Sequence, residues 1–322
     1  MTVMNVRRRL IPTAAVTAVT ALSLGTLSAC STDSAAVGNT DKFDVVASFY
    51  PLQFLAQQIG GDHVNVTSLT KPGQEPHDLE ISAKQTAQLQ ESDAVLYLKN
   101  LQPAVDDAVG QSGIGTKIDA ASLTSLEKHG NEVGGHAAGH DDHADEELAG
   151  LDPHVWLDPV RYAEVAGGVG KAFEKADPDH AADYKKNTAA LVRKLGALDT
   201  RFKDGLKNTR TKVFVTTHAA FGYLAERYGL TEEAISGLDP ESEPSANRGR
   251  GLETMAKADG VSTVFYETLV SDKTAKTIAA DAGLRTDVLD PIEGITSKSE
   301  GDDYFQVMDS NLKALQTALG AQ

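Results

Sequence analysis

Two series of short apolar runs, each run followed by a stretch with helical spacing, constrain the fold of this chain more than any other feature. The first series predicts strands over 44–49, 64–69, 94–98 and 117–120, and the second predicts strands over 212–217, 262–266 and 286–289. Helices are expected over 51–59, stopped by Gly60 and Gly61, and over 82–90, with Ser82 at the N-cap. This alternation is typical of βα units around parallel sheets. We therefore predict an α/β protein.

The stretch 159–208 separates the two series and contains no strand-like run. Its one break is Asp177-Pro178, which suits the cap and first position of a new helix. Apolar residues then recur at helical spacing, so we expect one helix followed by a helix of about 30 residues, roughly 45 Å long. The chain is thus predicted to form two lobes, each a small parallel sheet flanked by helices, joined by a long connecting helix. The expected boundaries are 43–176 for the N-terminal lobe, 177–210 for the linking helix and 211–322 for the C-terminal lobe.

The first residues of the chain have the pattern of a targeting segment. Arginines at 7–9 precede an apolar stretch over 10–27, and small residues lead to Cys30, the single cysteine. This ending resembles a bacterial lipobox, so we expect a signal peptide over 1–29, a lipid on Cys30 and a flexible polar tether over 30–42. The protein is accordingly predicted to be extracytoplasmic and lipid-anchored to the cell membrane. A single cysteine also excludes an intramolecular disulfide.

The net charge of the chain limits the classes of binding partner that we expect. The chain of 322 residues has a formal net charge of −16 at pH 7 and 41% hydrophobic residues, enough for two ordinary cores. A field of this sign repels nucleic acid and anionic lipid and attracts cations. We expect no nucleic-acid partner and a monomeric protein.

Three isolated histidines occupy positions that suit a metal site. His77 lies in the loop after the second predicted strand, His154 lies between two Asp-Pro turns, and His218 ends a predicted strand. Ligands of open parallel sheets bind beyond the carboxyl ends of the strands. Imidazole suits Zn(II), whereas Mn(II) prefers oxygen donors. The three histidines therefore predict a transition-metal site in the cleft between the lobes.

Other polar and histidine residues are expected to have roles other than metal binding. Asp78, Asp152 and Asp158 are candidates to orient the histidine rings by hydrogen bonding. His63, in a turn, and His180, in the first turn of a helix, are expected to face solvent.

A distinct segment over 127–147 combines acidic residues with His129, His136, His140 and His143. It has too few apolar side chains to offset its ordering entropy, so we expect a mobile loop. The composition favours weak auxiliary metal capture. A solvated polar loop with incidental histidines is the alternative.

Five segments occur in a recognisable order, at 75–78, 152–159, 217–223, 235–245 and 288–294. Together they resemble zinc-specific solute-binding lipoproteins of ABC transporters, the ZnuA-like group of the metal-binding cluster 9 family. The resemblance implies that His77, His154 and His218 bind the metal. For a fourth ligand it leaves two residues open: Glu293 matches a glutamate of zinc-binding relatives, and Asp290 matches an aspartate of manganese-binding relatives. Glu293 is preferred, and water could complete the shell instead.

The resemblance also implies a function without catalysis. The protein would capture Zn(II) as a transported ligand and deliver it to an ABC permease driven by its ATPase. Alternatives are a manganese-specific protein of the same family, a surface adhesin or a zinc hydrolase. Against a hydrolase, the sequence lacks a His-Glu-x-x-His helix. The long helix should limit lobe motion, so we expect metal release by local rearrangement around His218 and the carboxylate.

Overall fold

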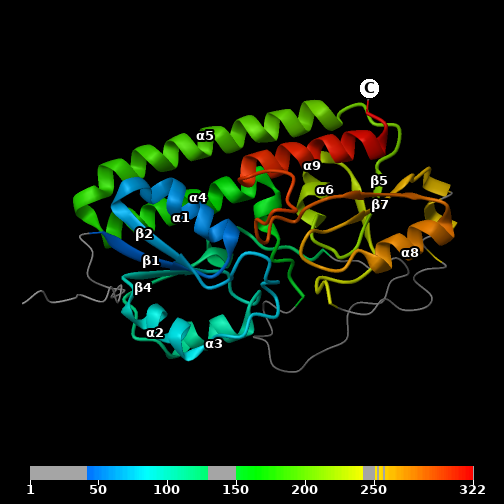
Figure 1. The fold of residues 1–322 in the computed structure, drawn as a ribbon. Coiled ribbons are helices and arrows are strands. Elements are labelled where there is room, and N and C mark those ends of the chain that lie inside the picture. The colour runs from blue at the N-terminus through cyan, green and yellow to red at the C-terminus, as the bar shows by residue number, and fades with distance from the viewer. Residues whose placement is uncertain (1–41, 130–149, 242–250, 252–253, 257, 322) are drawn as a thin grey trace, which may run out of the picture. The chain divides into compact units, whose positions relative to one another are not determined.

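The computed structural model describes residues 42–129, 150–241, 251, 254–256 and 258–321. Its first sheet has four parallel strands in the order β2-β1-β3-β4 (Figure 1). The strands are Phe43–Ala47 (β1), Val64–Ser68 (β2), Ala94–Tyr97 (β3) and Thr116–Asp119 (β4). The second sheet is also parallel and has the order β6-β5-β7-β8. Its strands are Val213–Thr216 (β5), Thr231–Ala234 (β6), Thr263–Tyr266 (β7) and Arg285–Val288 (β8). The predicted α/β class with two parallel sheets is confirmed.

Helices cover both sheets. They are Tyr50–Gly60 (α1), Ala83–Glu91 (α2), Pro103–Gln111 (α3), Pro159–Ala176 (α4), Ala181–Leu206 (α5), Gly222–Tyr228 (α6), Lys273–Ala282 (α8) and Tyr304–Leu319 (α9). Ser82 caps α2 as predicted, in a reciprocal pair with Gln85, and Gly61 ends α1 with φ 56°. None of the helices in the described ranges is both long and apolar enough to cross a membrane.

The strand β6 and the helix α3 are among the elements that were not predicted, and their sequences give weak signals. The strand β6 has the sequence Thr-Glu-Glu-Ala and lies at the edge of its sheet, pairing with β5 alone. An edge strand that is not packed on both faces needs no apolar run. The helix α3 buries only Val105 and Val109, so its apolar face is too narrow to stand out in the sequence.

The connection between the lobes differs in detail from the predicted helix. The helix α4 ends at Ala176, a 3₁₀ turn covers Pro178–His180, and α5 follows with 26 residues. Asp177 stands at the cap position, but its side chain makes no backbone cap. Its Oδ2 instead accepts hydrogen bonds from His180 Nδ1 at 2.8 Å and from the Tyr184 hydroxyl at 2.6 Å. Side-chain bonding thus replaces the expected cap and delays the start of α5.

The turn between α4 and α5 carries His180, which stacks on His63. His63 and His180 stack with ring centroids 4.1 Å apart, and their side chains are 30% and 34% exposed. His63 also pairs with Asp183 on α5 at 3.0 Å. The expectation that both rings face solvent therefore holds for part of each ring, and stacking covers the rest because the turn before α5 lies against the turn before β2.

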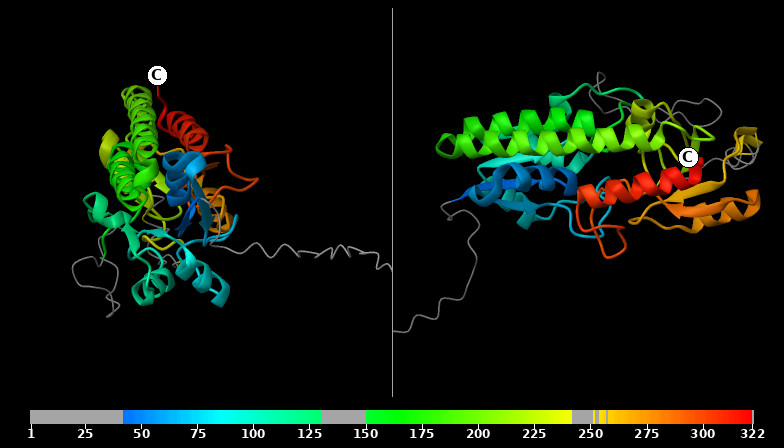
Figure 2. Two further views of the ribbon diagram at one scale, coloured as in Figure 1. Left: turned by 90° about the vertical axis from the view of Figure 1, so that its left-hand side faces the viewer. Right: turned by 90° about the horizontal axis from the view of Figure 1, so that it is seen from above.

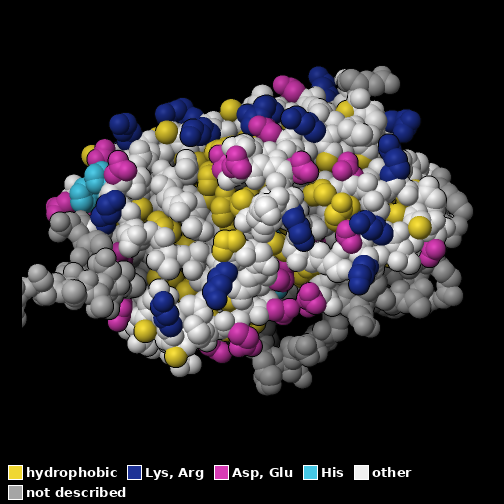
Figure 3. Space-filling view, in the orientation of Figure 1, with side chains coloured by type: hydrophobic (Ala, Val, Ile, Leu, Met, Phe, Trp, Pro, Cys, Tyr) yellow, Lys and Arg dark blue, Asp and Glu magenta, His cyan; other side chains and the backbone are white. Residues whose placement is uncertain are grey.

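The helix α5 contacts elements of both lobes. It packs along α4 and α1 at one end and along α9 and α6 toward the other (Figures 1 and 2). On the face seen in Figure 3, positive and negative side chains are interleaved, and apolar side chains lie in small groups between them. The apolar surface of α5 is directed inward instead, through side chains that include Leu191, Leu195 and Leu198.

One hydrophobic core runs through both lobes. Alternate residues of each sheet face it, including Val45 of β1, Phe214 of β5 and Phe265 of β7, and α5 adds Leu195. The residues between them, such as Val46 and Val215, face two smaller clusters on the outer sides of the sheets. The lobes are therefore joined by shared apolar packing as well as by a helix.

Candidate metal centre

Four side chains from separate parts of the chain meet between the two sheets. His77 lies in the loop after β2, His154 directly precedes the 3₁₀ turn Val155–Leu157, and His218 follows β5. Glu293 lies in the turn after β8. Three of the four therefore come from the carboxyl ends of strands, where parallel sheets place their ligands.

The donor atoms of these residues converge. Glu293 Oε1 lies 3.1 Å from His77 Nε2, 3.4 Å from His154 Nε2 and 3.9 Å from His218 Nε2. His154 Nε2 and His218 Nε2 are 3.4 Å apart. A tetrahedral zinc with ligand distances near 2.0–2.1 Å needs its donors about 3.3 Å apart. The four side chains thus have the chemistry and the spacing to hold such an ion.

Burial of the four residues is uneven. The side chains of His154, His218 and Glu293 are inaccessible to solvent, whereas that of His77 is 13% exposed. His77 is held from its own loop, where its backbone N–H donates to Glu75 Oε1 at 3.1 Å. Solvent therefore reaches the group from the side of His77.

Asp290 has a different place from Glu293. Its Oδ1 accepts the Ile292 N–H at 2.8 Å, and its Oδ2 accepts the Thr268 hydroxyl at 3.1 Å. Ile292 has φ 60°, a left-handed conformation that is rare for a β-branched residue. Asp290 therefore stabilises a strained turn, and that turn directs Glu293 to the histidines. Of the two candidates, Glu293 is the one within reach of a shared metal.

Each buried histidine is oriented by a carboxylate. His154 Nδ1 lies 2.7 Å from Asp152 Oδ1, and His218 Nδ1 lies 2.6 Å from Glu267 Oε1. These contacts leave both Nε2 atoms facing the centre, which is the usual arrangement around a metal-bound histidine.

Only one of the three predicted orienting carboxylates has that role. Asp152 does, whereas Asp158 caps α4 and pairs with Arg227. No contact described in the structure joins Asp78 to a site histidine. Glu267 was missed, although it directly follows the apolar strand β7, as His218 follows β5.

The pKa values of the group show how closely its charges are coupled. Burial alone would lower the pKa of His154, but hydrogen bonds with Asp152 and Glu293 outweigh it and raise the pKa to about 10. Burial likewise opposes the charge of His218, yet Glu267 raises its pKa. Burial would raise the pKa of Glu293, but the histidines, beginning with His77, hold it well below its usual range. Without a metal, the centre therefore retains protons that a metal would displace.

Glu75 also borders the centre. Burial, followed by repulsion from Glu293, raises the pKa of Glu75 to about 9. The protonated form avoids two like charges side by side in a buried site.

The remaining candidate residues are not part of this centre. His136, His140, His143 and Cys30 lie outside the described residues, as do 1–29 and most of the expected tether 30–42. His129, at the start of the histidine-rich segment, is described. Its Nδ1 lies 3.0 Å from Asp152 Oδ2, on the side of Asp152 away from His154.

Comparison with known proteins places the chain in a family. The family model described as zinc-uptake complex component A, periplasmic, matches residues 45–318. The chain is 37% identical over 296 residues to the zinc-binding lipoprotein AdcA of Streptococcus pneumoniae, covering 90% of this chain and 58% of that protein. It is 34% identical over 300 residues to the high-affinity zinc uptake system protein ZnuA of Bacillus subtilis, covering 90% of this chain and 91% of that protein.

A solved structure agrees with this placement. The Zn(II)-bound ZnuA-like domain of Streptococcus pneumoniae AdcA is 35% identical, with a TM-score of 0.70 over 86% of this chain and 99% of that domain. The chain thus spans little more than half of full-length AdcA but nearly all of its ZnuA-like domain. The fold, the order of the motifs and these matches show that the chain belongs to the periplasmic zinc-uptake component A family.

Proposed function

We propose that this protein is an extracytoplasmic receptor that captures Zn(II) and delivers it to an ABC permease driven by its ATPase. The observation that carries the proposal is the convergence of three imidazole nitrogens and Glu293 Oε1 within 4.8 Å of one another, with the oxygen 3.1–3.9 Å from each nitrogen. The names of the relatives, which are zinc-binding or zinc-uptake proteins, support the same ion. The protein acts as a binding protein and not as an enzyme.

The donor set favours zinc over manganese. Three nitrogens and one oxygen suit a tetrahedral Zn(II), whereas Mn(II) prefers a larger number of oxygen donors. Three neutral histidines and one carboxylate leave the bound dication with a charge of about +1. Asp152 and Glu267, each bonded to a ligand histidine, add two negative charges at short range and more than offset it. Burial of the ion costs less when its charge is compensated in this way.

Release should be local because the lobes are tied together behind the site. Trp156 Nε1 donates to the Pro291 carbonyl at 2.7 Å, and the Tyr304 hydroxyl donates to the Trp156 carbonyl at 2.7 Å. His218 is buried and bonded to Glu267, whereas His77 is part-exposed and lies in a surface loop. We therefore assign the first step of release to His77 rather than to His218. The bond between Glu293 and the metal would break next.

The membrane anchor and domain limits are part of the proposal. A lipid on Cys30, left by removal of 1–29, would hold the receptor at the membrane through the tether 30–42. The lobe limits 43–176 and 211–322, with the linking segment 177–210, agree with the positions of the two sheets.

Metal titration of the mature protein tests the function. Protein purified without added metal should contain zinc, and calorimetry should give one tight Zn(II) site with Mn(II) bound far more weakly. Uptake of ⁶⁵Zn by cells that lack the gene should be restored by the wild-type chain but not by His154→Ala. Tight manganese binding would favour a manganese-specific protein over a zinc-specific one. Uptake unaffected by His154→Ala would overturn the receptor role.

A matched pair of variants tests the fourth ligand. Glu293→Gln should weaken zinc binding strongly because the oxygen that faces all three histidines loses its charge. Asp290→Asn should retain most of the affinity, since Asp290 contacts the turn and not the histidine nitrogens. The reverse order of effects would assign the fourth position to Asp290.

A further inference from the structure

The short helix α6 is closely connected to one of the buried histidines of the centre. It begins at Gly222, shortly after His218 along the chain. The residues between them, 219–221, are buried, and the Phe221 N–H donates to both carboxylate oxygens of Glu232, each at 3.1 Å. The first turn of α6 is therefore held in a fixed position relative to His218.

A tyrosine of α6 also holds the backbone on which the other buried histidine depends. The hydroxyl of the buried Tyr223 donates to the Asp152 carbonyl at 2.8 Å and accepts the Glu127 N–H at 2.8 Å. The Asp152 N–H in turn donates to the Glu127 carbonyl at 2.8 Å. Asp152 is the residue whose Oδ1 orients His154 Nδ1. One hydroxyl thus fixes the position of the carboxylate that sets the His154 ring.

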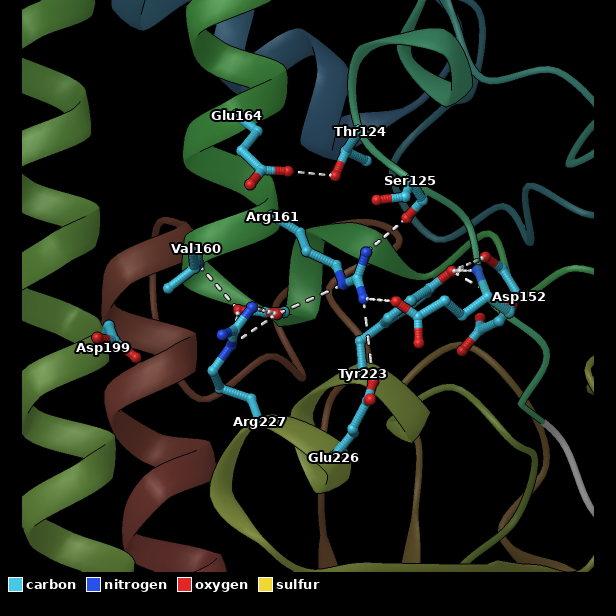
Figure 4. A network of polar contacts seen from close by, with 12 residues as sticks. Thr124, Ser125, Asp152, Val160, Arg161, Glu164, Asp199, Tyr223, Glu226 and Arg227 are labelled. Atoms are coloured by element: carbon cyan, nitrogen blue, oxygen red, sulfur yellow. Dashed lines mark hydrogen bonds and ion pairs between the residues drawn. The ribbon is translucent and has the colours of Figure 1, made fainter.

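The Tyr223 ring is itself held by its neighbours. The guanidinium of Arg161 on α4 lies over the ring, 4.6 Å from its centroid, and the His129 ring packs edge-on against it at 4.4 Å (Figure 4). The start of α6 lies close to Asp152, since a Cβ on Gly222 would come within 3.0 Å of Asp152 Oδ2. The hydroxyl is therefore a donor with a fixed position.

An arginine of α6 holds the other end of the same segment. Arg227 Nη2 lies 2.6 Å from Asp158 Oδ2, and its Nε lies 3.0 Å from Asp158 Oδ1. Asp158 is buried and also accepts the Val160 N–H at the start of α4. Paired contacts between a guanidinium and a carboxylate fix geometry as well as charge. The helix α6 therefore holds the segment 152–158 at both ends, and His154 lies between them.

We propose that Tyr223 and Arg227 are positioning residues for His154, through which α6 couples this ligand to His218. The inference rests on the proposed zinc-receptor function only where zinc affinity is the measured quantity. His77 and Glu293 lie on other segments, the loop after β2 and the turn after β8. The two buried imidazoles would thus form a rigid half of the centre that is already in place before the metal binds.

The first test uses the metal-free mature protein. Tyr223→Phe keeps the ring and removes the hydroxyl, so amide exchange in the segment 152–158 should become about tenfold faster, as expected for the loss of a buried hydrogen bond. Mass spectrometry of peptides measures the exchange. Tyr184→Phe is the matched control, because it removes a hydroxyl that donates to Asp177 Oδ2 from a buried ring on α5. It should leave exchange in 152–158 unchanged.

The second test measures zinc affinity in double-mutant cycles. Tyr223→Phe should lower the affinity about tenfold, the lower end of the range for partners that orient a ligand histidine. In a His154→Ala background it should cause no further loss, because the ring that it positions is gone. In a His77→Ala background the full loss should remain. Tyr184→Phe should leave the affinity unchanged in all three backgrounds.

Arg227→Lys is a second variant that keeps the charge but loses the paired contacts with Asp158, and it should give the same pattern. Thermal melts check that each variant is folded. Unchanged exchange in 152–158, or equal losses of affinity in the His154→Ala and His77→Ala backgrounds, would overturn the proposal. Faster exchange in Tyr223→Phe combined with no tight zinc binding by the wild type would instead contradict the receptor function and leave the positioning of His154 by α6 intact.

Discussion

At the scale of single residues, the centre depends on pairs in which a carboxylate fixes a histidine. Asp152 and Glu267 each hold one imidazole so that its second nitrogen faces Glu293. Only the first of these carboxylates stands within a histidine motif of the sequence. The two rings are thus set in place by residues that need not touch the metal.

Replacing His154 tests the centre most directly. We expect His154→Ala to lower Zn(II) affinity by more than about a hundredfold, since loss of an orienting partner alone usually costs 10–100-fold. Competition titration against a zinc chelator measures the effect. His180→Ala is the control, because His180 is bonded to Asp177 at the far end of α4 and should leave the affinity unchanged. Equal affinities for the two variants would exclude His154 as a ligand.

Zinc affinity should fall as the pH is lowered. The pKa of His154 is raised to about 10 and that of His218 is also raised, so both rings hold protons at pH values where a free histidine would not. A protonated imidazole cannot bind a metal, so zinc must displace these protons. We expect the affinity to decrease by up to about tenfold per pH unit for each displaced proton. Calorimetry in buffers of different ionisation enthalpy counts the protons, and a pH-independent affinity would contradict the assignment.

At the scale of elements, the 3₁₀ turn Val155–Leu157 connects the first lobe to the turn that carries Glu293. Trp156 is buried, packs edge-on against Phe49 with centroids 5.0 Å apart, and donates to the Pro291 carbonyl. One short element therefore both follows a ligand histidine and supports the segment of the opposing carboxylate.

Trp156→Phe should separate packing from hydrogen bonding. The substitution keeps an aromatic ring in the core but leaves the Pro291 carbonyl without its donor, at a cost of about 1–3 kcal/mol in the free energy of unfolding. Urea denaturation of the metal-free protein measures this loss. We also expect weaker zinc binding, because the turn before Glu293 loses a support. A stability equal to that of the wild type would mean that the bond contributes little.

At the scale of the whole described chain, the two lobes share a core and both pack on α5. Relative motion of the lobes would expose apolar side chains such as Leu195 and Phe214, each of which stabilises the fold by about 1.5–3 kcal/mol through burial. The shared core therefore resists wide separation of the two lobes. The loop 71–81, which carries His77, lies outside this core.

Hydrogen exchange distinguishes local motion of the loop that carries His77 from rotation of the lobes. Addition of Zn(II) should slow exchange in the loop 71–81 and the turn 290–294, and it should leave α5 unchanged because the core is already formed. Mass spectrometry of peptides from the metal-free and zinc-bound protein gives the comparison. Changes along α5 of the same size as those in the loop would indicate rotation of the lobes instead.

Much of the fold could be predicted from the sequence because apolar runs, glycine stops and the Ser82 cap are local signals. The strand β6 and helix α3 could not be, since an edge strand and a narrow helical face need few apolar residues. The stacked pair His63 and His180 depends on segments that meet only after folding. That His77, His154, His218 and Glu293 bind zinc stays a prediction until the titrations above are done.

The sequence by itself determined the class of fold and the candidate histidines, because both follow from the positions of residues relative to strand ends. Tertiary structure alone decided which carboxylates belong to them. Glu293 rather than Asp290 faces the histidines because Asp290 bonds its own turn and Ile292 takes a left-handed conformation. Glu267 and His129 acquire their positions through contacts across 49 and 23 residues of chain. Contacts of that range depend on the order of strands within a sheet and on the course of the segments between them, which no local pattern encodes.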